Sequence, residues 1–329
     1  MADQSIDVLR RAAASGGPLE LTRLAERLMG GSTPQELSEA GAALDQAIRA
    51  GGVEAPRMLA VLYAIGVCRP HDWDRALDLL QIAAERGSPS AQGQLAALAG
   101  ADAQDAQSPT PGHWRGLRAS IDPGDWERPG RQEILVRSPR IYRYAPFVSP
   151  AVCAWIIGRA QGRIERARVY DPDSLGSRVE GVRSNGAFAF NFPDLDVVLA
   201  MLRFRVAAYV GVGPGALEPP QVLHYRVGEQ FEPHYDFLDP ALPGHVGELA
   251  ERGQRTTTCL VYLNAEFEGG ETDFPLLGLS HKPPAGDGLC FSNVQPSGEP
   301  DRRTLHAGLA PIRGEKWILS QWIRGRPGG

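Results

Sequence analysis

The sequence QVLHYRVGEQFEPHYD, residues 221–236, predicts strand structure that ends on two metal-binding side chains. Val, Leu, Tyr and Phe are frequent in it, as in a half-buried strand. On a strand, residues i and i+2 point to the same side, so His234 and Asp236 can reach one metal ion. Two imidazoles and one carboxylate on one face of a metal suit Fe(II) in oxygen-activating sites. The second imidazole must therefore come from another strand.

His306, in the segment TLHAG, is the candidate for that third ligand, and Lys316 follows it by ten residues. A lysine binds a single carboxylate as a point charge on a long stem. The neighbouring Trp317 and Ile318 favour a buried position, where the ammonium needs an anionic partner. The alternative is a surface lysine at the start of a strand. The four side chains together predict a metal ion and a dicarboxylate co-substrate.

The chain from about residue 131 onward is rich in β-branched and aromatic runs bounded by Gly, Pro and Asn. The expected strands are IYRYAPFV (141–148), QVLHYRV (221–227), TTTCLVYLN (256–264), DGLCFSNV (287–294) and KWILSQWIR (316–324). Two helices are expected, Pro150–Arg159 and Asp194–Val210, the second with Asp194 as its N-cap. Many short strands with a few helices predict an α+β domain built on a double-stranded β-helix, or jelly roll.

Residues 1–100 are expected to be all-α, because Ala and Leu recur at helical spacing and Gly punctuates the ends. Ala47–Gly51 (AIRAG) recurs 36 residues further on as Ala83–Gly87 (AAERG). Repeats of this length predict stacked helical hairpins. The stretch from Ala55 to Leu98 resembles the Sel-one-like relative of the tetratricopeptide repeat. A generic helical bundle is the alternative. Residues 101–130, rich in Pro, Gly, Asp and Ser, are expected to be a linker.

The composition limits the classes of partner. A net charge of −5 and pI of about 5.9 give no overall attraction to nucleic acid or an anionic membrane, so neither is expected. No apolar run approaches the ~20 residues that span a bilayer, and the N-terminus lacks a signal-peptide core. The four cysteines form no C-x-x-C pair, and Cys259 and Cys290 are expected to be small buried hydrophobes. A cytoplasmic location follows as an expectation.

Residues 141–324 resemble the catalytic domain of the prolyl 4-hydroxylases, Fe(II)- and 2-oxoglutarate-dependent dioxygenases. QVLHYRVGEQFEPHYD, RTTTCLVYLN, EGGETDFP, KPPAGDGLCF and TLHAGLAPIRGEKWILSQWI are similar to segments of that family, in the family order. The resemblance implies Fe(II), 2-oxoglutarate and O2, with ascorbate as reductant. It also implies a peptide or protein substrate, with proline as the residue hydroxylated.

The same resemblance implies roles for individual positions. His234, Asp236 and His306 match the metal ligands. Lys316 matches the partner of the distal carboxylate of 2-oxoglutarate, Tyr225 a tyrosine that assists it, and Thr258 a position in the co-substrate pocket. Arg255, Trp322 and Arg183 match residues near the substrate cleft. Arg183 begins Arg-Ser-Asn where the family more often has Arg-Thr-Ser, which leaves the substrate open.

The predicted reaction is hydroxylation of a prolyl C–H bond, coupled to oxidative decarboxylation of 2-oxoglutarate to succinate and CO2. One alternative keeps this chemistry with a free amino acid or another small molecule as substrate. Another is an inactive scaffold that binds proteins through the helical repeats. The long polar segments Asp171–Gly181 and Asp239–Gly253 are expected to govern substrate choice.

Overall fold

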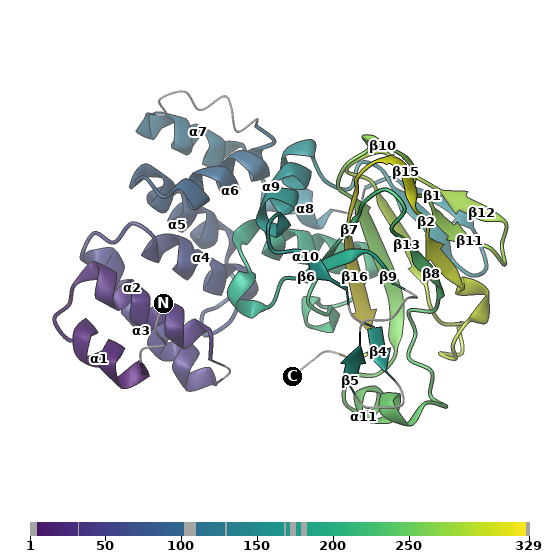
Figure 1. Ribbon diagram of the computed structural model, residues 1–329. Helices are drawn as coiled ribbons and strands as arrows, with labels where there is room; N and C mark the ends of the chain where they lie inside the picture. The colour runs from purple at the N-terminus through teal and green to yellow at the C-terminus, as the bar shows by residue number, and fades with distance from the viewer. Residues whose placement is uncertain are drawn as a thin grey trace. The chain divides into compact units, whose positions relative to one another are not determined.

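A computed structural model describes residues 5–31, 33–101, 110–128, 130–167, 169–171, 176–178 and 183–326. The chain forms two compact units. Unit 1 comprises Met1–Glu127 with Asn191–Leu202, and unit 2 comprises Arg128–Phe190 with Arg203–Gly329. Unit 1 is helical and unit 2 is built on antiparallel sheets (Figure 1). This confirms the α+β organisation, with helices first and a jelly roll after them.

Unit 1 is a succession of helical hairpins. Its helices are α1 (Ile6–Ala13), α2 (Pro18–Met29), α3 (Pro34–Arg49), α4 (Ala55–Ile65), α5 (Trp73–Glu85), α6 (Pro89–Ala99), α7 (Pro111–Ser120) and α8 (Pro123–Glu127). Side-chain caps define several starts: Thr33 and Glu36 form a capping box on α3, and Asp72 caps α5. Gly51 and Gly87, the ends of the repeated segment, follow α3 and α5 with φ of 86° and 92°. The repeat thus marks two equivalent helix-ending turns.

The segment expected to be a linker is helical where the structure describes it. Its prolines start α7 and α8, because proline is well suited to the first turn of a helix. Trp114 and Trp126 are buried, and Arg118 pairs with Asp74 and Asp78 of α5. The linker expectation was therefore wrong for residues 111–127. Pro and Gly in this segment punctuate two short helices and do not mark a break between domains.

In its described residues, unit 2 contains an eight-stranded sheet, a four-stranded sheet and two two-stranded sheets, all antiparallel. The eight-stranded sheet runs in the order β1 (Gln132–Val136), β2 (Ile141–Tyr144), β13 (Gly288–Ser292), β9 (Arg255–Tyr262), β16 (Lys316–Arg324), β7 (Gln221–Tyr225), β6 (Gly186–Ala189), β3 (Glu165–Arg166). The four-stranded sheet runs β12 (Leu279–His281), β11 (Thr272–Phe274), β14 (His306–Gly308), β8 (Phe231–His234). The two-stranded sheets pair β10 (Phe267–Gly269) with β15 (Pro311–Gly314) and β4 (Val169–Asp171) with β5 (Gly176–Arg178).

The core draws side chains from both sheets. On β9, Leu260 and Tyr262 point to one side, as alternation along a strand requires, and they join one apolar cluster. Phe274 of the four-stranded sheet and Phe291 of β13 pack edge to face in the same cluster, with ring centroids 5.1 Å apart. The strands β7, β16, β9 and β13 lie side by side and form the wall behind this core (Figure 1).

The two expected helices are present with one changed boundary. α9 (Pro150–Ala160) starts where the sequence predicted, with Ser149 as its cap. α10 (Val197–Val210) starts three residues after the predicted N-cap. Asp196, rather than Asp194, accepts the hydrogen bond from the Leu199 amide at 2.8 Å, while Asp194 closes a short 3-10 turn before it. Both aspartates have the chemistry of a cap, and only the backbone path decides between them.

Cys259 and Cys290 are buried as expected, but they form a disulfide. They are directly opposite each other in the pairing of β9 with β13. Cross-strand partners lie close enough for such a bond, and sequence spacing alone does not give the register that pairs them. The interpretation as two unpaired small hydrophobes was therefore incomplete.

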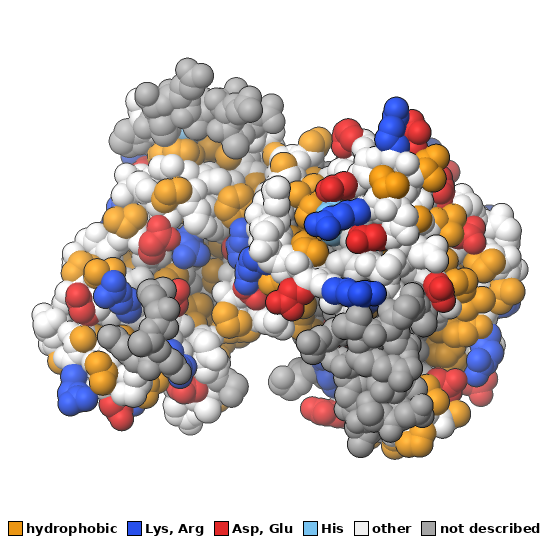
Figure 2. All heavy atoms as spheres, in the orientation of Figure 1, with side chains coloured by type: hydrophobic (Ala, Val, Ile, Leu, Met, Phe, Trp, Pro, Cys, Tyr) orange, Lys and Arg blue, Asp and Glu red, His pale blue; other side chains and the backbone are white. Residues whose placement is uncertain are grey.

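The surface carries charges of both signs. On the face shown in Figure 2, Lys and Arg side chains are interspersed with Asp and Glu. Among the described helices, none combines the length and the hydropathy that crossing a bilayer requires. Part of the segment Asp171–Gly181 lies outside the described residues, whereas Asp239–Gly253 contains the helix α11 (Pro243–Arg252).

Candidate functional site

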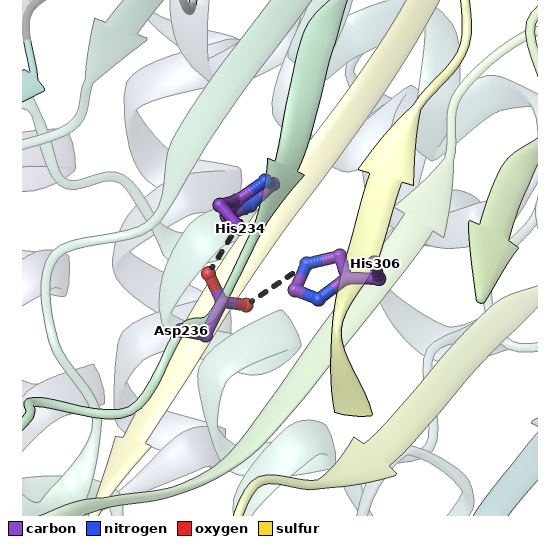
Figure 3. A group of neighbouring side chains, drawn as sticks. All are labelled: His234, Asp236 and His306. Carbon is purple, nitrogen blue, oxygen red and sulfur yellow. Dashed lines mark ion pairs between the residues drawn. The ribbon is translucent and has the colours of Figure 1, made fainter. Parts of the chain in front are cut away.

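The three predicted metal ligands converge in unit 2 (Figure 3). β8 ends at His234 and β14 begins at His306, and these two residues are cross-strand partners. Asp236 lies two residues beyond the end of β8. Its Oδ1 is 3.6 Å from Nε2 of His234, and its Oδ2 is 3.5 Å from Nε2 of His306. Ligand atoms of the three residues lie within 4.8 Å of one another, the one such group of His, Cys, Asp and Glu found among the described residues.

Backbone contacts fix which nitrogen of each imidazole faces the centre. Nδ1 of His234 is 2.8 Å from the carbonyl oxygen of Glu232, and Nδ1 of His306 is 3.0 Å from that of Thr304. A carbonyl oxygen only accepts, so both Nδ1 atoms carry the hydrogen. In the neutral rings both Nε2 atoms then present lone pairs toward Asp236. Three acceptors converge with no hydrogen between them, which is an arrangement that a bound cation stabilises.

The protonation states suit a cation site. Burial, with the nearby His306, lowers the pKa of His234 to about 3, so its ring is neutral near pH 7. Burial by itself would raise the pKa of Asp236. The positive charge that His306 and His234 carry when protonated, with a hydrogen bond from Thr258, more than offsets that effect and holds the pKa of Asp236 below its usual value. Asp236 is therefore a carboxylate, the form that binds metal.

A cavity leads from these ligands to Lys316, the first residue of β16. The Lys316 side chain is fully buried, and its Nζ has no hydrogen-bond partner in the part of the chain that the structure describes. Burial lowers the pKa of this ammonium to about 7. A buried cation without a hydrogen-bond partner is costly, so the part of the cavity beside Lys316 favours an anion.

Tyr225 lies beside Lys316, since the two residues are cross-strand partners in β7 and β16. The Nζ of Lys316 is 4.5 Å from the centre of the Tyr225 ring. Burial raises the pKa of Tyr225 to about 12, so its hydroxyl keeps its hydrogen at neutral pH and can donate it. A Cβ atom added at Gly308 would lie 2.9 Å from that hydroxyl oxygen. Glycine at 308 therefore makes room for the tyrosine hydroxyl in the cavity.

The structure places Thr258 away from the cavity lining. Its hydroxyl oxygen is instead 2.7 Å from the carboxylate oxygen Oδ2 of Asp236. Thr272 of β11 lines the cavity instead, and its hydroxyl is 2.6 Å from that of Tyr262. The sequence contained a signal for Thr272, because it shares the inward face of a strand with Phe274 in the segment EGGETDFP.

The three residues expected near the substrate cleft have different surroundings. Arg183 is buried, lines the cavity and lies over the ring of Phe231 at 4.5 Å. Trp322 lines the cavity from β16. The guanidinium of Arg255 stacks on the Trp322 ring at 3.9 Å. Its Nε and Nη2 donate to Glu218 over 2.7 and 3.0 Å. Glu218 carried no signal in the sequence, because 37 residues separate it from Arg255.

Comparison with known proteins agrees with this geometry. Residues 220–324 match the model of the 2OG-Fe(II) oxygenase superfamily. Probable prolyl 4-hydroxylase 3 of Arabidopsis thaliana is 33% identical over 211 residues, which are 58% of this chain and 71% of the relative. Prolyl 4-hydroxylase subunit alpha-1 of Rattus norvegicus is 33% identical over 199 residues, 60% of this chain and 37% of the relative.

Among solved structures, the 2OG complex of the viral collagen prolyl hydroxylase vCPH from Paramecium Bursaria Chlorella virus-1 is 28% identical. The likeness covers 56% of this chain and 95% of that one, with a TM-score of 0.43. The Arabidopsis relative is thus matched over 71% of its own length at 33% identity. The chain therefore belongs to the prolyl 4-hydroxylase family of 2OG-Fe(II) oxygenases.

Proposed function

We propose that this chain hydroxylates a prolyl residue of a peptide or protein, using Fe(II), 2-oxoglutarate and O2. The observation that carries the proposal is one cavity lined by three converging acceptors and by a buried ammonium that has no hydrogen-bond partner among the described residues. This arrangement separates the site of a metal from the site of a carboxylate within the same enclosure. A molecule with a chelating group and a distal carboxylate, such as 2-oxoglutarate, fits both sites.

His234, Asp236 and His306 are the residues that would hold Fe(II). Their donor set of two neutral imidazoles and one carboxylate fits that ion, and it leaves positions for a co-substrate and oxygen. When bound, the metal supplies the activation of O2 that accompanies oxidative decarboxylation of 2-oxoglutarate. The protein holds the ligands in place and keeps the enclosure dry, which the burial of Asp236 and His306 supports.

Lys316 and Tyr225 would bind the distal carboxylate of 2-oxoglutarate. The ammonium gains the anion that it lacks, and the tyrosine hydroxyl donates a hydrogen bond beside it. We propose Thr272 for the co-substrate pocket in place of Thr258, because Thr272 is among the residues that line the cavity. Thr258 is proposed to orient the metal ligand Asp236 through its hydrogen bond to the carboxylate.

The choice of proline rests on the names of the relatives, which are prolyl hydroxylases of plants, animals and a virus. Arg183 and Trp322, which line the cavity, are proposed to contact the substrate. Arg255 is proposed to hold the Trp322 indole, since two of its donors are already paired with Glu218. Ascorbate as reductant, protein docking by the helical repeats and a cytoplasmic location stay predictions.

The metal assignment is tested by the visible charge-transfer band that 2-oxoglutarate gives on chelating Fe(II). The full-length protein is mixed with both under anaerobic conditions. We expect the band in the unchanged protein and in the control Asp273→Ala, which alters a carboxylate of β11 outside the metal group. Asp236→Ala should abolish it. A band that persists in Asp236→Ala would reject the three proposed ligands.

The substrate is tested by mass spectrometry of a proline-containing peptide and of free proline after turnover in air. We expect the peptide to gain the mass of one oxygen atom, in step with succinate formation. If only free proline is hydroxylated, the small-molecule alternative replaces the peptide. If the band forms but no substrate of either kind is turned over, the co-substrate assignment survives and the proline assignment fails.

A further inference from the structure

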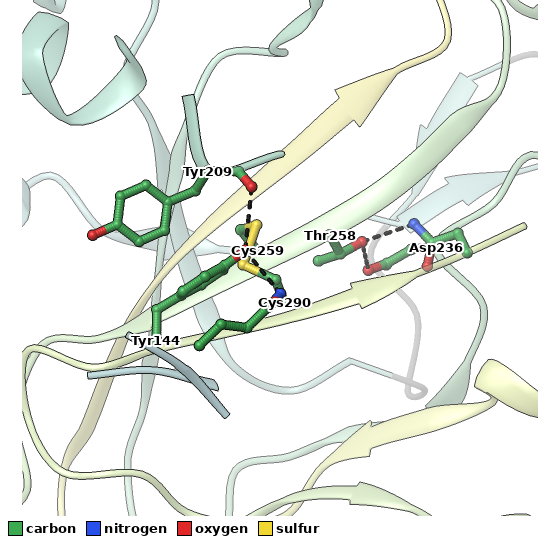
Figure 4. Close-up of a disulfide and its surroundings, with 8 residues drawn as sticks. Tyr144, Tyr209, Asp236, Thr258, Cys259 and Cys290 are labelled. Atoms are coloured by element: carbon green, nitrogen blue, oxygen red, sulfur yellow. Dashed lines mark hydrogen bonds between the residues drawn. A yellow bond between two sulfur atoms is a disulfide. The ribbon is translucent and has the colours of Figure 1, made fainter. Parts of the chain in front are cut away.

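A chain of two hydrogen bonds leads from the end of β13 to Asp236. The amide Nδ2 of Asn293 is 2.9 Å from the hydroxyl oxygen of Thr258, and that oxygen is 2.7 Å from Oδ2 of Asp236 (Figure 4). Thr258 and Asn293 are completely buried, and Asp236 is 6% exposed. Burial removes water as a competing partner, so these two bonds are worth more than they would be at the surface.

The direction of both bonds follows from the chemistry of the groups. An ionised carboxylate has no hydrogen, so the Thr258 hydroxyl must donate to Asp236. Its oxygen is then free to accept, and the amide nitrogen of Asn293 can only donate. Asn293 therefore keeps the hydroxyl hydrogen of Thr258 pointing at Asp236. Without it, the hydroxyl could rotate to other positions.

The backbone holds the two polar side chains in place. Thr258 lies opposite Phe291 in the pairing of β9 with β13, and the next pair along is the disulfide of Cys259 with Cys290. The backbone N–H of Asn293 donates to the backbone carbonyl of Thr256 at 2.8 Å, and the backbone carbonyl of Asn293 accepts from the backbone N–H of Asp301 at 3.0 Å. The Thr258 and Asn293 side chains thus project from two strands that a disulfide joins. These strands are a rigid support for Asp236, which lies beyond the end of β8.

We infer that Thr258 and Asn293 are positioning residues of the metal centre, which fix the orientation of the Asp236 carboxylate between the two imidazoles. This inference rests on the proposed metal function of His234, Asp236 and His306. Groups that orient a ligand typically change metal affinity by about 10–100-fold when they are removed. Asn293 acts on the metal only through Thr258.

The test is binding of Mn(II) to the full-length protein without co-substrate, measured as free Mn(II) by electron paramagnetic resonance. Thr258→Val removes the hydroxyl at nearly constant volume, and we expect the Kd for Mn(II) to rise about 10–100-fold. Thr258→Ser restores a hydroxyl and should return the Kd to within about threefold of the unchanged protein. Thr257→Val is the matched control on the opposite side of β9, and we expect no change. If Thr258→Val does not give folded protein, Thr258→Ala carries the same expectation.

A double-mutant cycle tests the role of Asn293. Asn293→Ala alone should weaken Mn(II) binding, whereas in the Thr258→Val background it should cause no further loss. If the factors by which the two substitutions raise the Kd for Mn(II) multiply in the double variant, Asn293 acts independently of Thr258. That result would overturn the proposed hydrogen-bond chain from Asn293 to Asp236. Unchanged affinity in Thr258→Val would overturn the inference as a whole. Failure of the proposed function has a different signature, because then Asp236→Ala would bind Mn(II) as well as the unchanged protein.

Discussion

Lys316 has a charge that depends on what is bound beside it. Its pKa is lowered to about 7 by burial, so above that pH the empty pocket increasingly contains a neutral amine. A bound carboxylate favours the ammonium, so 2-oxoglutarate binding takes up a proton at alkaline pH. The affinity should therefore be constant below about pH 7 and decrease above it.

We expect the Kd for 2-oxoglutarate to increase by up to about tenfold per pH unit above that value, measured by the charge-transfer band. Lys316→Arg is the control, because a guanidinium stays protonated over this range. Its Kd should not share this dependence on pH, whatever its absolute value. An equal pH dependence in Lys316→Arg would assign the titration to another group.

Gly308 gives a second prediction about the same pocket. A Cβ atom there would lie 2.9 Å from the Tyr225 hydroxyl oxygen, so Gly308→Ala should displace the phenol from its place near Lys316. A hydrogen bond to a charged group contributes about 1.5–3 kcal/mol, so both Gly308→Ala and Tyr225→Phe should weaken 2-oxoglutarate binding roughly tenfold or more. Gly213→Ala, with open space around its added Cβ, should leave the Kd unchanged. If Gly308→Ala binds 2-oxoglutarate normally while Tyr225→Phe binds it weakly, the added Cβ does not displace the Tyr225 hydroxyl from its ligand, and the prediction for Gly308 is wrong.

The predictability of the site differs from residue to residue. His234 and Asp236 are close in sequence, and strand alternation was enough to expect them together. His306 and Lys316 were selected by residue type and spacing, and the order of the family segments added support. Asn293 could not be foreseen, because its place beside Thr258 depends on the register of β9 with β13 across 35 residues. The hydrogen bond of Thr258 to Asp236, across 22 residues, was equally hidden from the sequence.

At the scale of elements, the repeated segment in unit 1 makes a matched pair of predictions. Gly51 and Gly87 have φ of 86° and 92°, and nothing lies within 4 Å of a Cβ added at either position. The cost of alanine there is thus one of backbone conformation, about 1–2 kcal/mol at each position. We expect Gly51→Ala and Gly87→Ala to lower the free energy of unfolding in urea by similar amounts.

Gly116 is the control, because alanine there should raise the free energy of unfolding and not lower it. It lies inside α7 with open space around its added Cβ, so alanine should stabilise the helix by about 0.5–1 kcal/mol. A loss of stability for Gly116→Ala similar to that of Gly87→Ala would mean that the turn conformation is not the cause. The same contrast explains why helices and turns of unit 1 could be expected from the sequence. Local conformational preference decides them.

At the scale of the whole molecule, the sequence indicated a helical part followed by a sheet-rich part, but it did not indicate which residues belong to each. Asn191–Leu202 belongs to unit 1, although it lies between strands of unit 2 in the sequence. The amide of Val197 donates to the side chain of Gln94 at 2.9 Å, a bond across 103 residues. Composition and periodicity report local structure only, so they could not reveal a contact of this range.

Binding of the proposed ligands gives a prediction for the stability of the folded protein. His234, Asp236, His306 and Lys316 all belong to unit 2. A ligand that binds only the native state stabilises it. Ligands at about 100 times their Kd stabilise the native state by about 2.7 kcal/mol, which corresponds to an increase in Tm of roughly 5 °C.

The measurement is thermal unfolding of the full-length protein followed by circular dichroism at a sheet wavelength, with and without Mn(II) and 2-oxoglutarate, because the proposed ligands bind in the sheet-rich unit 2. We expect the increase in the unchanged protein and in Asp273→Ala, whereas Asp236→Ala should abolish it. An equal increase in Asp236→Ala would contradict metal binding at the three proposed ligands.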